Sequence, residues 1–232
     1  MHTHDTVTAS TDRPSIMARL KAETLEHHMR AERHPFMAAM IQGRLPVASY
    51  CEHLQQMLLE HEAIESALER ARSMHAWASV IEPWQFQAEN LKADIAHFGG
   101  TITPVAGDAA RRLIDRIREA EHTHPIELLG MHYVTEGSKN GAVFIARVLR
   151  KAYELPPGQG DRSLDPYGPA QRERWAWFKQ AVDALPLGPA EHEAVIEGAK
   201  AMFDGITGIA EDQWQSAAHA ETKPAASSRA AV

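Results

Sequence analysis

The spacing of apolar residues constrains the fold of this chain more than any other feature, because apolar residues recur every three or four positions along most of the sequence. That period predicts amphipathic helices, and prolines and glycines separate one helix from the next. We expect helices over residues 15–34, 36–42, a long segment from Pro46 past Leu68, 83–99, 107–121, 125–155, 170–184 and 189–214. Residues 125–155 carry the longest uninterrupted pattern. No strand, internal repeat or heptad run is recognisable, so the sequence predicts an all-α bundle of about seven helices.

The length and the net charge limit the classes of protein to which this chain can belong. A chain of 232 residues fits a single core, and its net charge of −7 argues against a nucleic-acid partner. We expect a helical domain over residues 15–215, a flexible N-terminal segment over 1–14 and a disordered tail over 216–232. The Pro-, Gly- and Asp-rich stretch 156–169 is expected to be a mobile loop that borders a site.

The cysteine content and hydropathy pattern indicate where the protein resides. Cys51 is the only cysteine, so no internal disulfide can form. Residues 1–14 are polar and lack the apolar run of a signal peptide, and no stretch approaches the roughly 20 apolar residues that span a bilayer. We therefore expect a cytoplasmic protein without a membrane segment.

A histidine and a glutamate four residues apart form the first candidate site. His28 and Glu32 share one face of the first predicted helix, so the carboxylate can hold one imidazole nitrogen while the other points away. Such support fixes the tautomer of a metal-binding histidine and raises its basicity. The alternative is a boundary histidine that a neighbouring carboxylate simply satisfies, and the spacing alone does not decide between the two.

Three glycines form the second candidate site. Gly130, Gly137 and Gly141 follow one another at seven and four residues, so they line one stripe of the helix predicted over 125–155. Each interior glycine costs about 1 kcal/mol relative to alanine, and a flat ligand lying against bare backbone would compensate. Close packing of two helices through small residues is the alternative. With His28 on one helix and bare backbone on another, the two features predict a slot for a planar metal macrocycle.

The sequence around both features resembles the heme oxygenase family. The stretch Leu20–Glu32, followed by Phe36-Met37, looks like the proximal helix of that family, in which the residue matching His28 binds the iron and the residue matching Glu32 supports it. Tyr133–Ala142 is similar to the distal helix of the bacterial branch. The similarity continues through 151–156 and 195–200, so it covers about residues 15–212.

The resemblance implies a set of site residues. It places His28 as the metal ligand, and it assigns catalytic positions to Gly137, Ser138, Asn140 and Gly141 and haem contacts to Lys21, Glu32, Gly137, Gly141, Ala142 and Lys179. Lys21 and Lys179 match basic residues that neutralise the propionates of haem. Ser138 stands where animal and cyanobacterial members carry an aspartate, and Lys139 and Asn140 depart from the usual residues, so the delivery of distal protons is unassigned.

The resemblance also implies a reaction. Members of the family open haem, which is both substrate and cofactor, at a meso carbon with molecular oxygen, and they release biliverdin, carbon monoxide and iron. Electrons must come from outside, since the chain shows neither a Gly-rich dinucleotide fingerprint nor an iron–sulfur cysteine set. A ferredoxin or flavoprotein reductase is therefore the expected donor, and a biliverdin-using photoreceptor is a further candidate partner. The meso carbon attacked, the physiological role and the oligomeric state stay open.

Two alternatives have the same fold. One is a haem carrier or sensor without turnover. The absence of the distal aspartate supports this alternative. The other is a haem-free relative, either a thiaminase-like hydrolase with Cys51 as nucleophile or a di-iron oxidase. The polar groups that could suggest such a metal site are Glu60, His61 and Glu65, then Asp94 with His97, and His132 with Glu136.

Overall fold

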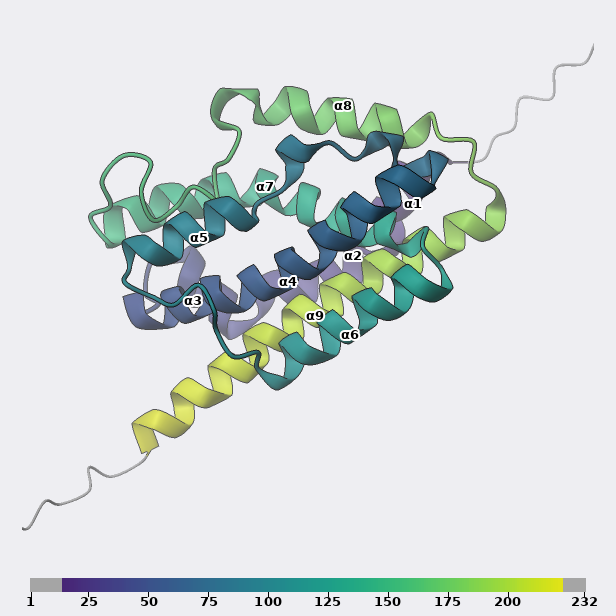
Figure 1. Cartoon of the computed structure of the whole chain (residues 1–232). Helices are drawn as coiled ribbons and strands as arrows, with labels where there is room; N and C mark the ends of the chain where they lie inside the picture. Colours follow the sequence, from purple (N-terminus) through teal and green to yellow (C-terminus); the bar gives the residue numbers. More distant parts are fainter. Residues whose placement is uncertain (1–13, 223–232) are drawn as a thin grey trace, which may run out of the picture.

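The computed structural model describes residues 14–222, and within them it is built of α-helices with three short 3-10 turns and no strand (Figure 1). The all-α prediction is therefore confirmed, although nine α-helices are present rather than about seven. The helices are α1 (Ile16–Glu23), α2 (Leu25–Arg33), α3 (Pro35–Ile41), α4 (Val47–Met74), α5 (Ala88–His97), α6 (Asp108–Thr123), α7 (Glu127–Ala152), α8 (Gln171–Asp183) and α9 (Pro189–Thr222); the 3-10 turns are η1 (Ala76–Val80), η2 (Pro83–Gln85) and η3 (Gly168–Ala170).

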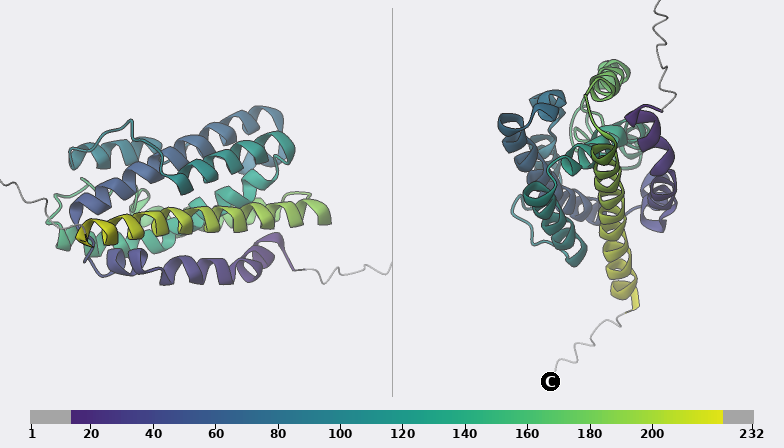
Figure 2. Two further views of the ribbon diagram at one scale, coloured as in Figure 1. Left: turned by 90° about the horizontal axis from the view of Figure 1, so that it is seen from below. Right: turned by 90° about the vertical axis from the view of Figure 1, so that its right-hand side faces the viewer.

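The helices form layers around α7 and α9. In both views of Figure 2, α9 runs between the N-terminal helices α1–α3 on one side and α4 and α6 on the other. Helix α7 packs along α9 over a long interface, and α8 lies beside α7 and α1. The apolar core fills the space between these layers, so the candidate site residues of α2 and α7 come from an outer and a central layer.

The backbones of α7 and α9 meet at two glycines. A Cβ atom at Gly130 would lie 1.7 Å from the Val195 carbonyl oxygen, and one at Gly198 would lie 2.1 Å from the Glu127 carbonyl oxygen. Neither distance is possible for two atoms that are not bonded, so only glycine allows this approach. The central pair of helices is locked together at this point.

The first predicted helix is divided in two. The sequence predicts one helix over 15–34, whereas the structure ends α1 at Glu23 and begins α2 at Leu25. The buried Thr24 between them has φ −101° and ψ 1°, and its hydroxyl donates to the Leu20 carbonyl at 2.7 Å. A hydroxyl that bonds a carbonyl of its own helix competes with the regular backbone ladder, which explains the break.

The start of α5 also differs from the prediction. Pro83 begins only the short turn η2, and α5 begins at Ala88. The carboxylate of Glu65, on α4, accepts hydrogen bonds from the backbone N–H groups of Gln87 at 2.5 Å and Ala88 at 3.2 Å. A carboxylate at a helix N-terminus satisfies donors that the helix leaves free, so a residue distant in sequence caps α5.

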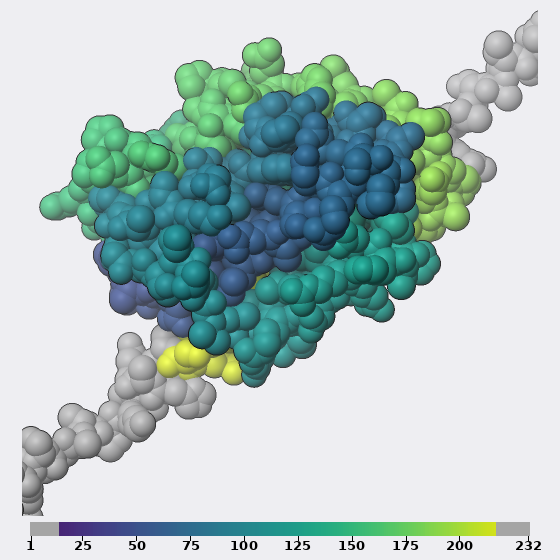
Figure 3. All heavy atoms as spheres, viewed as in Figure 1, coloured from purple at the N-terminus to yellow at the C-terminus, as the bar shows by residue number. Residues whose placement is uncertain are grey.

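The loop after α7 is held in place by several side chains. Asp94 of α5 accepts from the backbone N–H groups of Arg162 and Ser163 at 2.9 and 2.8 Å, and Arg150 of α7 pairs with Asp161 and Asp165. This anchored loop is the green segment beside α5 in Figure 3, which views the molecule from the face formed by α4, α5 and α6. The expectation of a mobile loop over 156–169 finds no support in these contacts.

Helix α9 extends farther than predicted. It continues to Thr222, so the predicted disordered tail over 216–232 is helical in its first seven residues, and 34 residues make α9 longer than α7. The rest of that tail, and the predicted flexible segment apart from Pro14, lie outside the described residues. Within the described chain, no helix is both long enough and apolar enough to cross a bilayer.

Candidate functional site

Helix α2 packs mainly on α9, and the segments just before and after it contact α7. Thr24, just before α2, hydrogen-bonds Tyr133 of α7, and burial raises the pKa of the Tyr133 phenol while that bond lowers it. Beyond α2, helix α3 packs on α7, and Gly43 approaches Val148 and Ala152 so closely that a Cβ atom would lie 3.0 Å from each. These two contacts reach α7 at Tyr133 and at Val148 and Ala152, so Gly137 and Gly141 lie between them along α7.

His28 presents a half-exposed imidazole on α2. Its side chain is 49% exposed, and its Nε2 lies 3.6 Å from Glu32 Oε1, so the predicted pair is present beyond hydrogen-bond distance. Phe203 of α9 meets the ring edge-on, with centroids 5.5 Å apart. No described residue bonds Nδ1 of His28, so the histidine retains a nitrogen free to bind a metal.

The glycine stripe on α7 divides into a packed part and an open part. The predicted stripe included Gly130, but that residue is buried against α9 and takes no part in the site. A Cβ atom at Gly141 would have no heavy atom within 4 Å, and one at Gly137 would meet only Trp175, at 3.5 Å. We call the surface at Gly137 and Gly141 the open face of α7. The alternative of helix packing is therefore correct for Gly130 and wrong for Gly141.

The polar residues on this part of α7 bond locally. The hydroxyl of Ser138, an exposed residue, donates to the Thr135 carbonyl at 2.9 Å and keeps its lone pairs as acceptors. The amide nitrogen of Asn140 donates to the Gly137 carbonyl at 2.9 Å, and its oxygen accepts from Gln171 of α8 at 3.1 Å. Ala142, next to Gly141, is partly exposed.

Helix α8 provides an aromatic wall beside the open face. Trp175 lies over Gly137, its ring is 5.9 Å from that of Tyr133, and it stacks on Phe178 at 5.7 Å. Lys179 holds its ammonium 5.8 Å from the Trp175 ring and is exposed. Lys21 is likewise exposed on α1, which packs against α8, so the helices that carry the two lysines are neighbours.

A buried polar cluster lies on the side of α7 away from solvent. Sequence analysis named Glu136 and Lys139 separately but did not identify them as partners. The Lys139 ammonium pairs with Glu136 and donates to the Gln85 carbonyl at 2.7 Å and to the Tyr167 hydroxyl at 2.8 Å. The Tyr167 hydroxyl also donates to Glu136 at 2.9 Å. Burial lowers the pKa of Lys139 and raises that of Tyr167. The Glu-x-x-Lys spacing from 136 to 139 is the only local signal for this cluster.

Neighbouring ionisable groups on α4 extend that cluster. His61 bonds Glu65 at 2.9 Å and lies 3.6 Å from Glu60, and His132 of α7 bonds the Gln85 side chain at 3.1 Å. Burial raises the pKa of Glu60 to about 7 and lowers that of His132 well below its usual value. In the part of the chain that the structure describes, no three His, Cys, Asp or Glu side chains are arranged to hold a metal ion.

Cys51 does not have the surroundings of a nucleophile. Its thiol is buried, and burial raises its pKa, which keeps it protonated. His53, two residues farther along α4, is also buried, and its Nδ1 bonds Gln213 at 2.9 Å. The hydrolase alternative therefore lacks an activated cysteine.

The fold and the site together define a class: an all-helical bundle with a half-exposed histidine on α2 and bare, uncovered backbone on α7. Residues 15–212 match the family model described as heme oxygenase. The chain belongs to the heme oxygenase family. Heme oxygenase 2 of Synechocystis sp. is 22% identical over 82% of this chain and 79% of that protein, and heme oxygenase 1 of Nostoc sp. is 26% identical over 82% of each.

Solved structures give the same assignment. Heme oxygenase from Leptospira interrogans superposes with a TM-score of 0.79 at 27% identity, covering 85% of this chain and 98% of that one. Heme oxygenase-1 from Synechocystis sp. in complex with heme has a TM-score of 0.81 at 19% identity, covering 90% of this chain and 96% of that one. At 19% identity, the second comparison shows the shared fold alone. The independent match at 27% identity supports the same fold.

Proposed function

We propose that this protein is a haem-degrading oxygenase that binds haem between α2 and α7. Its products would be biliverdin, carbon monoxide and iron. The observation that carries the proposal is the open face at Gly141, where a Cβ atom would meet nothing within 4 Å, beside a helix whose His28 has an unpartnered ring nitrogen. A planar ligand needs bare backbone on one side, and its iron needs an imidazole on the other.

The residues present fit haem. His28 supplies a neutral nitrogen ligand, and Glu32 lies close enough to support the ring once a small movement shortens their 3.6 Å separation. Lys21 and Lys179, exposed on neighbouring helices, supply positive charge for two carboxylates. When held by these residues, haem would supply the oxygen-activating iron chemistry and would itself be the substrate.

The distal side acts through backbone and a hydroxyl rather than through an acid. Gly137 and Gly141 let the ligand approach α7, and Trp175 limits the space beside Gly137. Ser138 can accept a hydrogen bond from water at the open face, because its own proton is held by the Thr135 carbonyl. Proton delivery would therefore run through water ordered by Ser138.

Electrons and partners follow from the same proposal. A ferredoxin or flavoprotein reductase would supply the electrons, and a biliverdin-using photoreceptor would be one consumer of the product. A chain with this function would work in the cytoplasm, where reduced donors are available.

Titration of the purified protein with hemin tests the proposal. We expect one equivalent to bind with a sharp histidine-ligated absorption band, and reductant under oxygen should then convert that spectrum to biliverdin with release of carbon monoxide. His28→Ala should abolish turnover while leaving the fold intact, and added imidazole should restore part of it. The matched control is His122→Ala, which removes an exposed histidine of α6 outside the candidate site. Full turnover in His28→Ala would refute the assignment of the ligand.

A haem carrier is the second candidate, because no acidic residue occupies the distal position of Ser138. The same experiment separates the two functions. A carrier would bind hemin through His28 and keep its haem spectrum after reductant and oxygen are added.

A further inference from the structure

Helix α2 has no hydrophobic anchor of its own. None of its nine residues is buried, whereas the preceding α1 buries Ile16, Met17 and Leu20. The hydrophobic effect, which fixes most helices in a bundle, therefore contributes little to the position of α2. Since α2 carries His28, the position of the candidate iron ligand must be set by polar contacts.

One carboxylate on α9 provides those contacts. Asp204 Oδ1 accepts a hydrogen bond from His27 Nδ1 at 2.6 Å and also pairs with the Arg30 guanidinium. The adjacent Phe203 meets the ring of His28 edge-on. Two consecutive residues of α9 thus contact positions 27, 28 and 30, on both sides of the candidate ligand.

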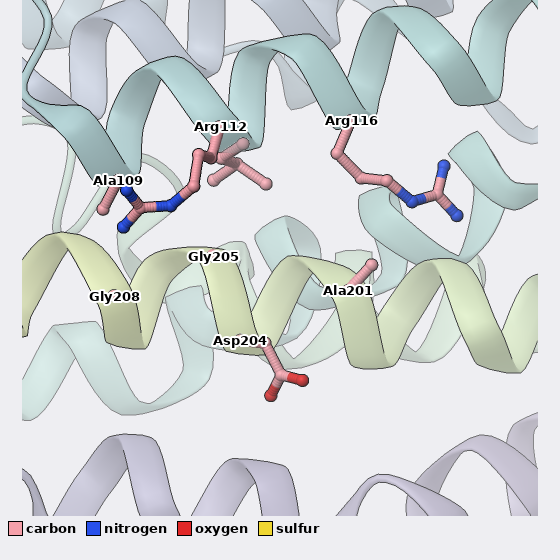
Figure 4. A pocket seen from close by; sticks show the side chains of 8 residues that line it. Ala109, Arg112, Arg116, Ala201, Asp204, Gly205 and Gly208 are labelled. Atoms are coloured by element: carbon pink, nitrogen blue, oxygen red, sulfur yellow. The ribbon is translucent and has the colours of Figure 1, made fainter.

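Asp204 is directed toward α2 and not toward the basic residues on its other side. Asp204 lines a groove of about 220 Å³ between α6 and α9, across which Arg112 and Arg116 lie. Figure 4 shows its carboxylate pointing away from both arginines, toward the purple N-terminal helices. Arg116 instead pairs with Glu127 of α7. Asp204 therefore pairs with residues of α2 and not with the arginines of α6.

We infer that Asp204 is a positioning residue for the haem-iron ligand. By holding His27 and Arg30 it fixes the distance and rotation of α2 relative to α7, and so the place where His28 meets the iron. This inference rests on the proposed function. Asp204 would touch neither haem nor the reacting atoms.

Two further ion pairs join the N-terminal helices to α9, and the one on α1 serves as an internal control. Arg19 of α1 pairs with Glu193 at 2.8 Å, and His34 at the end of α2 pairs with Glu211 at 2.7 Å. Asp204 and Glu211 are about equally exposed, at 49% and 48%, and Glu193 is 62% exposed. Exposed pairs contribute little to global stability, so Asp204→Ala and Glu193→Ala should leave the melting temperature of the apo-protein nearly equal.

Hemin affinity and the ligand bond distinguish positioning from mere stability. We expect Asp204→Ala to raise the dissociation constant for hemin about fivefold, and to shift and broaden the iron–histidine stretching band of the ferrous complex. Glu193→Ala should change neither quantity. Asp204→Asn keeps an acceptor for His27 and Arg30, so it should restore most of the affinity. The effects of Asp204→Ala and Arg30→Ala should not add in the double variant.

The outcomes separate this inference from the proposed function. If the wild-type protein binds hemin through His28 while Asp204→Ala keeps the affinity and stretching band of Glu193→Ala, the inference is overturned and the function stands. If the wild-type protein does not bind hemin, or if His28→Ala binds it unchanged, the function fails and the inference with it.

Discussion

Gly130 and Gly141 occupy the same stripe of α7 but have opposite surroundings. At Gly130 a Cβ atom would lie 1.7 Å from a backbone oxygen of α9, and at Gly141 it would meet nothing within 4 Å. Both glycines cost the helix about 1 kcal/mol relative to alanine. Contact with α9 offsets that cost at Gly130. No packing contact in the described chain offsets it at Gly141, which lies on the face where we propose that haem binds.

The open half of α7 keeps its shape because its opposite face is fixed. Lys139 points inward there and holds Glu136, Tyr167 and Gln85 together. A helix face can stay empty only if contacts behind it prevent collapse. The following predictions test this contrast between the packed and the open half, beginning with the largest expected effect.

Lys139→Met should lower the free energy of unfolding by about 3–5 kcal/mol, because it leaves the buried Glu136 carboxylate without its cation. Urea denaturation measures the loss. The double variant Glu136→Gln/Lys139→Met removes both charges and should regain most of the stability. Equal losses in the single and double variants would show that the change in side-chain volume, and not the unpaired charge, causes the loss of stability.

Gly130→Ala should destabilise the protein by about 3 kcal/mol or more, since the added methyl group forces α7 and α9 apart. Gly141→Ala is the matched control on the same helix, and it should gain up to about 1 kcal/mol from helix propensity. Thermal or urea unfolding of the apo-proteins compares the two. Similar changes in stability at both positions would contradict the distinction between a packed half and an open half of α7.

Glu60→Met should change the pH dependence of stability. Burial raises the pKa of Glu60 in the folded state from 4.5 to about 7, so its protonated form favours folding at low pH and that contribution is lost as the pH rises through 7. Each pKa unit corresponds to about 1.36 kcal/mol. The stability of the variant relative to wild type should therefore increase by up to about 3 kcal/mol between pH 4.5 and pH 7.5. Urea titrations at both pH values test this, and a constant difference would contradict it.

Gly141→Leu should weaken hemin binding at least about tenfold, because a branched side chain would occupy the open face. The folded apo-protein should lose no stability, since leucine has the better helix propensity and meets open space. Parallel measurements of apo melting temperature and hemin affinity decide the matter. Lost stability with unchanged affinity would indicate helix packing at Gly141 and remove the haem site from α7.

Glu32→Gln should have the smallest effect, a loss of hemin affinity of less than about tenfold. An amide still holds the imidazole of His28 but supplies less basicity, so the iron–histidine stretching frequency of the ferrous complex should fall. Glu26→Gln, on the same helix, is the control. An unchanged frequency in Glu32→Gln would remove the supporting role.

Local patterns in the sequence predicted most of the fold. The all-α class, most helix ends and the pair His28–Glu32 follow from contacts within four residues, which a sequence displays directly. The predicted 15–34 helix was wrong only at Thr24, where a side-chain hydroxyl competes for a backbone carbonyl. The start of α5 could not be predicted, because its capping group, Glu65, lies more than twenty residues away.

The tertiary structure alone decided which of the three glycines of α7 is packed and which is open. Gly130, Gly137 and Gly141 are equivalent in spacing, and only the position of α9 buries the first and leaves the last open. The partnership of Asp204 with His27 and Arg30 spans more than 170 residues of sequence, so no local period reveals it. Helix periodicity is a property of neighbouring residues, whereas a binding face is defined by what a distant helix does or does not cover.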